Sequence, residues 1–431
     1  MKIIYRLINA FQSHLGKKAL GKALSISALN QAVSSGANFA LGIYLMRMLT
    51  PLDFGLYGIG FAISLFYFGF GHALFLIQMV VHMPDKAPED RLPYAGRMFL
   101  LVAIFCIFTI FLTILFLIVS GFVWGSIVLH EELACAILAS SVAYLLKDFF
   151  VRHAYNLNRE TWVLAIHVVI ACTMFFLLWL QSQLMLSLSV ETALWIYAVA
   201  QASGAILGYL LAKLPVADHK LSIVLSDLRE AWYGGRWASM TNLVFFARTQ
   251  AHTIVVTLLL GPVGVAKLNA ARLLVTPAIM FTPALSQVAI PRLAAAREQD
   301  VYYLIRLGRW ITFSLLMVAL LYSAILLSSY DFIADKVLTE DYRDFFLITA
   351  LWCLYTCFLA LRNGIEMIGQ VLKKFKQLSI ANMYSAVVSL IATYWLTVGY
   401  GLPGTLIGLI AGEINLILLA YGALRSLREA A

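Results

Sequence analysis

The sequence predicts an all-α polytopic membrane protein with 12 transmembrane helices in two six-helix lobes. Three observations carry this prediction: composition, the length of the apolar segments and the placement of charge. Hydrophobic residues make up 62% of the 431 residues and charged residues only 12%, with a mean hydropathy of +0.87. A soluble domain carries roughly 25% charged residues, so half that amount leaves too little polar surface to face water. The apolar residues must therefore face lipid as well as a core.

The apolar segments have the length that a membrane span requires. Each covers about 20 to 28 residues, enough to cross roughly 30 Å of hydrocarbon as a tilted helix. The first six are 23–48, 53–80, 95–120, 133–155, 161–184 and 191–212. The second six are 234–260, 263–290, 303–329, 344–367, 376–399 and 403–424.

The basic residues predict the orientation of these spans. With the N-terminus inside, 25 of the 31 Lys and Arg fall on the inner side, including Lys147 and Arg152 at the end of the fourth span, and four fall on the outer side. The remaining two, Arg248 and Arg272, lie within spans. Because cytoplasmic loops are enriched in Lys and Arg, we expect both termini in the cytoplasm. The same bias accounts for the net charge of +9, so we expect no nucleic-acid partner.

Two amphipathic stretches divide the chain into four parts. We expect residues 1–20 to form an interfacial amphipathic helix and 21–212 to form the first lobe. Residues 213–232 read as a cytoplasmic linker with a second amphipathic helix, and 233–431 as the second lobe. The turns at Pro51 and Pro262 are related by an offset close to half the chain, which favours two similar halves.

The sequence contains no recognisable catalytic motif or metal-ligand pattern. The five cysteines lie inside apolar stretches, and we interpret them as core residues without metal-ligand spacing. No connection is long enough to form a catalytic domain, and no glycine-rich phosphate loop is present. We therefore expect no enzyme activity, no bound metal and no cofactor.

Arg248 is the first candidate for a substrate-binding residue. It lies near the middle of the seventh span, where a charge costs roughly 2.5–3.5 kcal/mol, and His252 follows one turn later on the same face. An arginine that lines a cavity there can bind an anionic group. The alternative is a buried arginine that pairs with an acidic group and holds one lobe together.

Arg272 is a second intramembrane cation, with Asn269 and Thr276 on the same face of the eighth span. It can face a cavity, or its long side chain can reach the outer headgroups. Gln31 and Asn38 belong to one polar stripe of the first span and are predicted to line the cavity. Arg47 is a further candidate for substrate binding. It falls on the opposite face of that span, however, where it can instead brace the outer hairpin with Asp53.

Glu413 is the acidic residue in the middle of a span. A carboxyl in that position can serve cation coupling, with H+ or Na+ as the coupling ion. The competing interpretation is a salt bridge to Arg248. Glu366 follows Arg362 by one turn and is predicted to form a local ion pair with it.

Four short stretches carry a resemblance to a known family. The run RMLTPLDFGLY at 47–57 resembles the first hairpin of Wzx-type polysaccharide flippases, members of the multidrug/oligosaccharidyl-lipid/polysaccharide (MOP) superfamily. LGP at 260–262 with NAARL at 269–273, PRL at 291–293 and LTEDY at 338–342 resemble later parts of the same family. One departure concerns coupling: His252 stands where relatives often carry an aspartate.

The resemblance implies two bundles arranged as a V around a central cavity that opens alternately to each side. It implies a flippase that moves an undecaprenyl-diphosphate-linked oligosaccharide from the cytoplasmic to the periplasmic leaflet of a bacterial inner membrane. The protein is expected to act as a monomer in the bilayer, with other glycan-assembly proteins as potential partners. Cationic rather than acidic residues inside the spans favour this substrate over the cationic compounds that multidrug (MATE) exporters carry.

Overall fold

A computed structural model describes residues 15–124, 131–185, 187–215, 220–343 and 345–425 of the chain. These residues are almost entirely helical, as the composition predicts. Within the described ranges, nine helical segments are long and apolar enough to cross a membrane. The protein is therefore a multi-pass membrane protein, while the count of 12 spans and the cytoplasmic side of both termini stay predictions.

The first group of helices comes from the N-terminal half of the chain. It comprises α2 (Leu15–Met48), α3 (Pro51–Gly71), the π-helical turn η1 (His72–Leu76), α4 (Ile77–His82), the 3-10 turn η2 (Met83–Asp85), α5 (Pro88–Trp124), α6 (Glu131–Asn156), α7 (Glu160–Gln183) and α8 (Val190–Ala212). Elements α3, η1 and α4 follow each other without a break, so they form one long helix with a π-helical turn inside it. The expected interfacial helix at 1–20 falls mostly outside the described residues, and its last six residues belong to α2.

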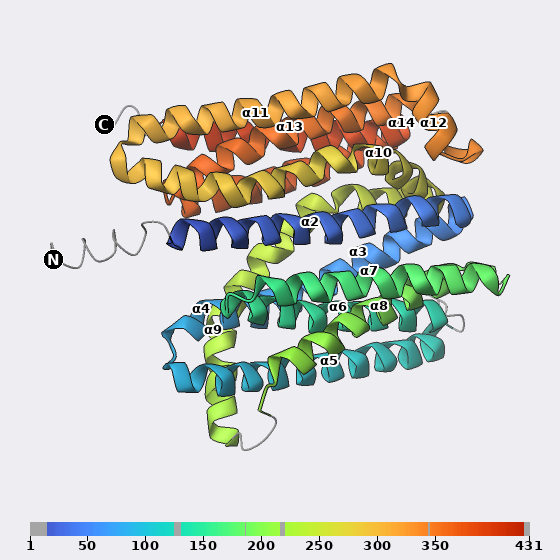
Figure 1. The fold of residues 1–431 in the computed structure, drawn as a ribbon. Helices are drawn as coiled ribbons and strands as arrows, with labels where there is room; N and C mark the ends of the chain where they lie inside the picture. The colour runs from blue at the N-terminus through green and yellow to red at the C-terminus, as the bar shows by residue number, and fades with distance from the viewer. Residues whose placement is uncertain (1–14, 125–130, 186, 216–219, 344, 426–431) are drawn as a thin grey trace.

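The second group comes from the C-terminal half. It comprises α10 (Ala251–Gln299), α11 (Val301–Ser328), α12 (Tyr330–Val337), the 3-10 turn η3 (Glu340–Tyr342), α13 (Phe346–Val371) and α14 (Phe375–Arg425). Figure 1 shows α11, α13 and α14 along one side of the molecule and α5, α6 and α8 along the other, with α2 between them. The start of α2 and the end of α14 lie at the same end of the molecule (Figure 1), as an even number of crossings requires.

Two glycines break the longest helices at predicted boundaries between spans. Gly261 has φ 72° inside α10, and Gly401 has φ 63° inside α14. This left-handed region is readily open only to glycine, because any other residue places a Cβ against the backbone. Each glycine therefore reverses the chain, so that α10 and α14 each contain a helical hairpin.

Helix α9 (Leu221–Thr249) departs from the predicted organisation. Residues 221–232 of the expected amphipathic linker and the start of the seventh span form one continuous helix through residue 233, because no proline or positive-φ residue interrupts it there. The break falls instead at Gln250, between α9 and α10. In Figure 1, α9 crosses from the first group of helices towards the second. It therefore connects the lobes instead of belonging to one of them.

Candidate binding site between the two lobes

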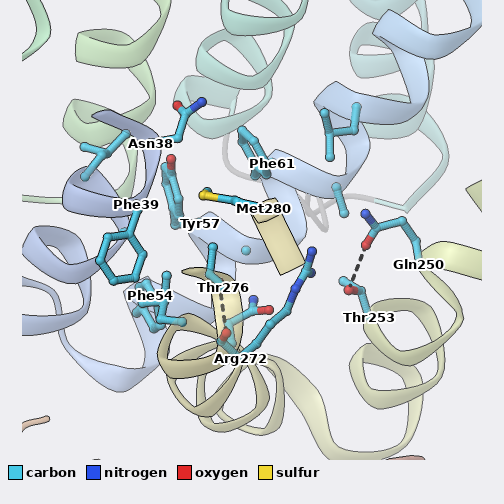
Figure 2. Close-up of a pocket in the computed structure, with 17 residues that line it drawn as sticks. Asn38, Phe39, Phe54, Tyr57, Phe61, Gln250, Thr253, Arg272, Thr276 and Met280 are labelled. Carbon is cyan, nitrogen blue, oxygen red and sulfur yellow. Dashed lines mark hydrogen bonds between the residues drawn. The ribbon is translucent and has the colours of Figure 1, made fainter. Parts of the chain in front are cut away.

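A pocket lies between helices from the two halves of the chain. Helices α2 and α3 contribute one wall. Helix α10, together with Gln250 just before it, contributes the other. The empty space measures about 910 Å³, part of it open to the surroundings. Its labelled lining residues in Figure 2 are Asn38, Phe39, Phe54, Tyr57, Phe61, Gln250, Thr253, Arg272, Thr276 and Met280.

Arg272 supplies the positive charge of this pocket. Its side chain extends from α10 into the pocket (Figure 2), and the guanidinium carbon lies 5.9 Å from the ring centre of Trp352. No Asp or Glu lines the pocket, and among the described residues Arg272 has no carboxylate ion-pair partner. A guanidinium that is partly buried and unpaired is costly in a membrane, so the pocket is suited to an anion that completes the pair.

Neutral polar groups surround the guanidinium. Asn269 lies one turn before Arg272 in α10, and the hydroxyl of Thr253 donates to the side-chain oxygen of Gln250 over 3.1 Å. The absence of a side chain at Gly58 makes room for Asn269, because a Cβ there would lie 2.4 Å from the Asn269 amide nitrogen. Amide and hydroxyl groups donate and accept hydrogen bonds, as recognition of sugars or phosphate oxygens requires.

Arg248 lies outside this pocket, in a buried ion-pair network that joins α9 to α13 and α14. Its Nη1 is 3.2 Å from Oε1 of Glu413, and only 5% of Arg248 and 4% of Glu413 is exposed. Arg362 contacts the other carboxylate oxygen of Glu413 over 2.7 Å and Glu366 over 2.8 Å. The predicted Arg362–Glu366 pair is thereby confirmed. The geometry of Arg248 matches the alternative interpretation, a buried arginine that pairs with an acidic group. The positive charges of the two arginines are balanced by the two glutamates.

His252 also lies outside the pocket. The imidazole is 3% exposed and packs edge to face against Trp352, with ring centres 5.5 Å apart. Neither ring nitrogen has a hydrogen-bond partner among the described residues. Trp352 donates its indole N–H to the carbonyl of Leu268 over 3.1 Å, which fixes the ring between His252 and Arg272. His252 therefore packs against Trp352, and Trp352 in turn contacts Arg272 of the pocket.

The predicted residues of α2 occupy three different places. Asn38 lines the pocket, whereas Gln31 donates to Ser35 over 2.8 Å further along the helix and does not line it. Arg47 donates to the backbone carbonyl of Lys336 over 2.9 Å. The expected contact between Arg47 and Asp53 is replaced by this link to α12, because Asp53 instead accepts from the hydroxyl of Thr50 at the start of α3.

Two hairpins close the end of the pocket near residue 54. One joins α2 to α3, and the other lies within α10 at Gly261. Gly55 lies so close to the second hairpin that a Cβ there would be 1.9 Å from the carbonyl oxygen of Pro262. Phe54 packs edge to face against Tyr342, with ring centres 6.2 Å apart. Burial raises the pKa of the Tyr342 phenol, so this group stays neutral and packs as an aromatic residue. The hairpins of α3 and α10 therefore seal one end of the interface between the lobes.

The first lobe contains a second charged cluster, around Asp148 of α6. Asp148 lies 3.8 Å from Nε2 of His72, 4.0 Å from Nζ of Lys147 and 3.3 Å from Nε of Arg152. Lys147, which the charge count places on the inner side, is 4% exposed, and its ammonium lies 4.0 Å from the ring centre of Tyr144. The turn of α6 that carries these residues is thus inside the helical bundle.

The cysteine prediction holds for three of the five residues. Cys106, Cys353 and Cys357 are buried, whereas Cys135 and Cys172 are exposed on the helix surface. The interpretation of all five as core residues is wrong for these two, because an exposed helix face in an apolar span is as hydrophobic as a buried one.

Two lobes of membrane-length helices with a polar pocket between them have the architecture of a multi-pass transporter or flippase. A family model described as "Polysaccharide biosynthesis protein" matches residues 20–297, and the chain belongs to this family. This family match confirms the resemblance drawn from the four sequence stretches, and the solved structures below share the fold.

Three solved structures illustrate the similarity in fold. An inward-facing multidrug resistance MATE family transporter of the MOP superfamily has a TM-score of 0.66 and 15% identity, over 93% of this chain and 95% of its own. The lipid II flippase MurJ in an inward closed conformation has a TM-score of 0.66 and 14% identity, over 95% and 87%. An outward-facing MATE transporter of the same superfamily has a TM-score of 0.62 and 17% identity, over 96% of both chains. No curated protein matches the sequence.

Proposed function

We propose that the protein is a flippase that moves an undecaprenyl-diphosphate-linked oligosaccharide from the cytoplasmic to the periplasmic leaflet of a bacterial inner membrane. The observation that carries this proposal is Arg272, an unpaired guanidinium in a pocket between the lobes that no carboxylate lines. A guanidinium forks onto phosphate oxygens and stays charged at every physiological pH. A diphosphate is therefore a fitting partner for this pocket.

The rest of the proposed cycle follows from the physical problem. Transfer of sugars and a diphosphate into hydrocarbon costs too much free energy, whereas an apolar polyprenyl chain is stable there. The polar headgroup would pass between the lobes and bind beside Arg272, Asn38 and Asn269. The hairpin contact of Gly55 with Pro262 would then open on one side as the lobes rock. The polyprenyl chain stays in lipid throughout. This process breaks no covalent bond, so we propose a transporter rather than an enzyme.

Transport against a gradient requires an energy source, and we propose coupling to H+ or Na+. Glu413 was singled out for this role from its place in a span. Its contacts with Arg248 and Arg362 favour a bracing role in the state described, and a coupling role requires those contacts to open during the cycle. We propose that the chain works as a monomer, with other glycan-assembly proteins as partners.

A second candidate function is export of organic cations, which the names of the MATE structures suggest. A pocket for cations needs a carboxylate or an aromatic cage that is free of competing positive charge. The pocket has aromatic walls in Phe54, Tyr57 and Phe61, but Arg272 lies among them. Electrostatic repulsion between like charges therefore disfavours a cationic substrate.

A vesicle assay with the purified protein tests the proposal. Fluorescent undecaprenyl-diphosphate oligosaccharide would be placed in both leaflets and its outer-leaflet fraction followed by a membrane-impermeant quencher. We expect Arg272→Ala to slow flipping by at least about tenfold, because a charge-assisted contact is worth about 1.5–3 kcal/mol. Arg272→Lys should keep part of the rate, since it retains charge without the fork.

Lys267→Ala is the matched control, because Lys267 lies on the same helix but outside the pocket, over the ring of Phe345. It should flip at the wild-type rate. Wild-type flipping by Arg272→Ala would overturn the role of this residue. Wild-type vesicles that export ethidium but leave the glycolipid in place would instead establish the second candidate function.

A further inference from the structure

The part of α9 before residue 238 has two chemically different faces. Asp227 and Glu230 are the acidic residues of this helix, and both point at the first lobe. Asp227 pairs with Arg97 of α5, and Glu230 lies 3.2 Å from Lys86 and 3.3 Å from His82. The negative charge of α9 is thus used in holding the helix against α4 and α5.

A second face of α9, whose edge at Tyr233 and Trp237 adjoins Glu230, combines two arginines with three large aromatic residues. We name it the arginine–aromatic stripe, and it consists of Arg229, Trp232, Tyr233, Arg236 and Trp237. At about 100° per residue, these five positions fall on one side of the helix, and the two arginines lie about 10.5 Å apart along it. All five side chains are exposed, with 54% of Trp232, 71% of Tyr233 and 67% of Trp237 accessible.

The arginines of this stripe have no carboxylate partner among the described residues. The guanidinium carbon of Arg236 lies 4.9 Å from the ring centre of Tyr233 and 5.6 Å from that of Trp237. Stacking on two rings holds the guanidinium in place while its N–H donors stay free. An exposed guanidinium that is held in place in this way, with the second exposed arginine two turns away, attracts an anion.

The chemistry around the stripe identifies the kind of anion. Trp and Tyr concentrate where a bilayer changes from headgroup to hydrocarbon, because each ring has an apolar body and a polar edge. On the same face, towards the middle of the membrane, α9 continues with the exposed apolar side chains of Met240 and Leu243. Along the helix the two arginines alternate with the aromatic residues, and apolar residues follow, so the phosphate of a phospholipid can meet the arginines while its acyl chains lie along the apolar end.

We infer that the arginine–aromatic stripe of α9 is a binding surface for an anionic phospholipid of the surrounding bilayer. The phosphate lies between Arg229 and Arg236, and the acyl chains run along Met240 and Leu243. On the predicted topology this lipid belongs to the cytoplasmic leaflet. Because α9 also carries Arg248 at its other end, a lipid held here contacts the helix that joins the two lobes.

Native mass spectrometry of the full-length protein in detergent tests this inference. Phosphatidylglycerol and phosphatidylcholine would be titrated in parallel, and the affinity of the first bound lipid measured. We expect the wild-type protein to prefer phosphatidylglycerol and the double variant Arg229→Gln, Arg236→Gln to lose at least about tenfold in affinity for it. Its affinity for phosphatidylcholine should not change.

The double variant Lys373→Gln, Lys376→Gln is the matched control. It removes the same charge from the exposed turn after α13 (Lys373) and from the first turn of α14 (Lys376), on the same predicted side of the membrane. We expect less than a twofold effect, so an equal loss in both double variants would overturn the inference in favour of general charge attraction. Tyr233→Leu with Trp237→Leu keeps both charges and should weaken binding by a smaller factor. Equal melting temperatures without lipid establish that the variants fold.

Three further outcomes would also contradict the inference. Unchanged phosphatidylglycerol affinity in the arginine variant would place the lipid elsewhere. Loss of undecaprenyl diphosphate with phosphatidylglycerol retained would make the stripe part of the substrate path. A dimer that dissociates in the arginine variant would make the occupant a second copy of this chain. The measurement needs no flipping activity, so its result is independent of the proposed function.

Discussion

The carboxylate of Glu413 lies between the guanidinium groups of Arg248 and Arg362, with Nη1 of Arg248 3.2 Å from Oε1. The hydroxyl of Tyr355 also donates to this carboxylate over 3.4 Å. The three charged side chains come from α9, α13 and α14. This network therefore ties the connecting helix α9 to the second lobe.

Glu413→Gln is predicted to destabilise the protein more than Arg248→Met. Loss of the carboxylate leaves two buried arginines facing each other, and removing one partner of a buried pair costs about 3–5 kcal/mol. Arg248→Met leaves Glu413 paired with Arg362 and should cost less. Thermal unfolding in detergent measures both, and Glu340→Gln, at an exposed ion pair, is the control. If Glu413→Gln melts like the wild type but loses ion dependence of transport, Glu413 is a coupling residue instead of a brace.

Gly55→Ala is predicted to open the hairpin end of the pocket. The added Cβ would meet the backbone of Pro262 at 1.9 Å, and a backbone atom cannot turn aside as a flexible side chain can. We expect Thr276→Cys, in a background without the five native cysteines, to react faster with an impermeant maleimide added from outside. Gly36→Ala is the control, since nothing lies within 4 Å of its added Cβ. Equal labelling in both variants would show that this contact does not close the pocket.

Asp227→Asn is predicted to loosen α9 from the first lobe. The pair of Asp227 with Arg97 is largely buried, so the substitution leaves the arginine without its counter-charge. Backbone amides near the start of α9 should exchange hydrogen at least about tenfold faster, because local opening becomes easier by more than about 1.4 kcal/mol. Hydrogen exchange with mass spectrometry measures this, with Glu89→Gln at an exposed site as the control. Unchanged exchange would mean that packing alone holds the helix.

Trp352→Ala is predicted to slow flipping although Trp352 does not line the pocket. The substitution removes the ring over which the Arg272 guanidinium lies and leaves space beside His252. We expect a loss of about three- to tenfold, in line with a cation–π contact of about 0.5–2 kcal/mol. Trp352→Phe should retain most of the rate, because it keeps a ring and loses the hydrogen bond to Leu268. A larger loss in Trp352→Phe than in Trp352→Ala would contradict the positioning role.

Part of the pocket could be predicted from one segment of sequence. Asn269, Arg272 and Thr276 follow helical spacing, and all three line the pocket. Gln250, Tyr57 and Phe61 were not predicted, because a polar residue at a helix break and aromatic residues in a span are common features without function. Only their convergence from α3 and α10 makes them part of one site.

The sequence by itself determined that this chain lies in a membrane, and it placed span boundaries between 260 and 263 and between 399 and 403, where the structure has Gly261 and Gly401. Composition and the length of an apolar run are local properties, so neighbouring residues are enough to specify them. The tertiary structure decided which buried arginine is paired. Arg248 and Arg272 look alike in sequence, but Glu413 neutralises the first from 165 positions away and no carboxylate reaches the second among the described residues. Charge pairing acts through space between helices, and only the packed fold sets those distances.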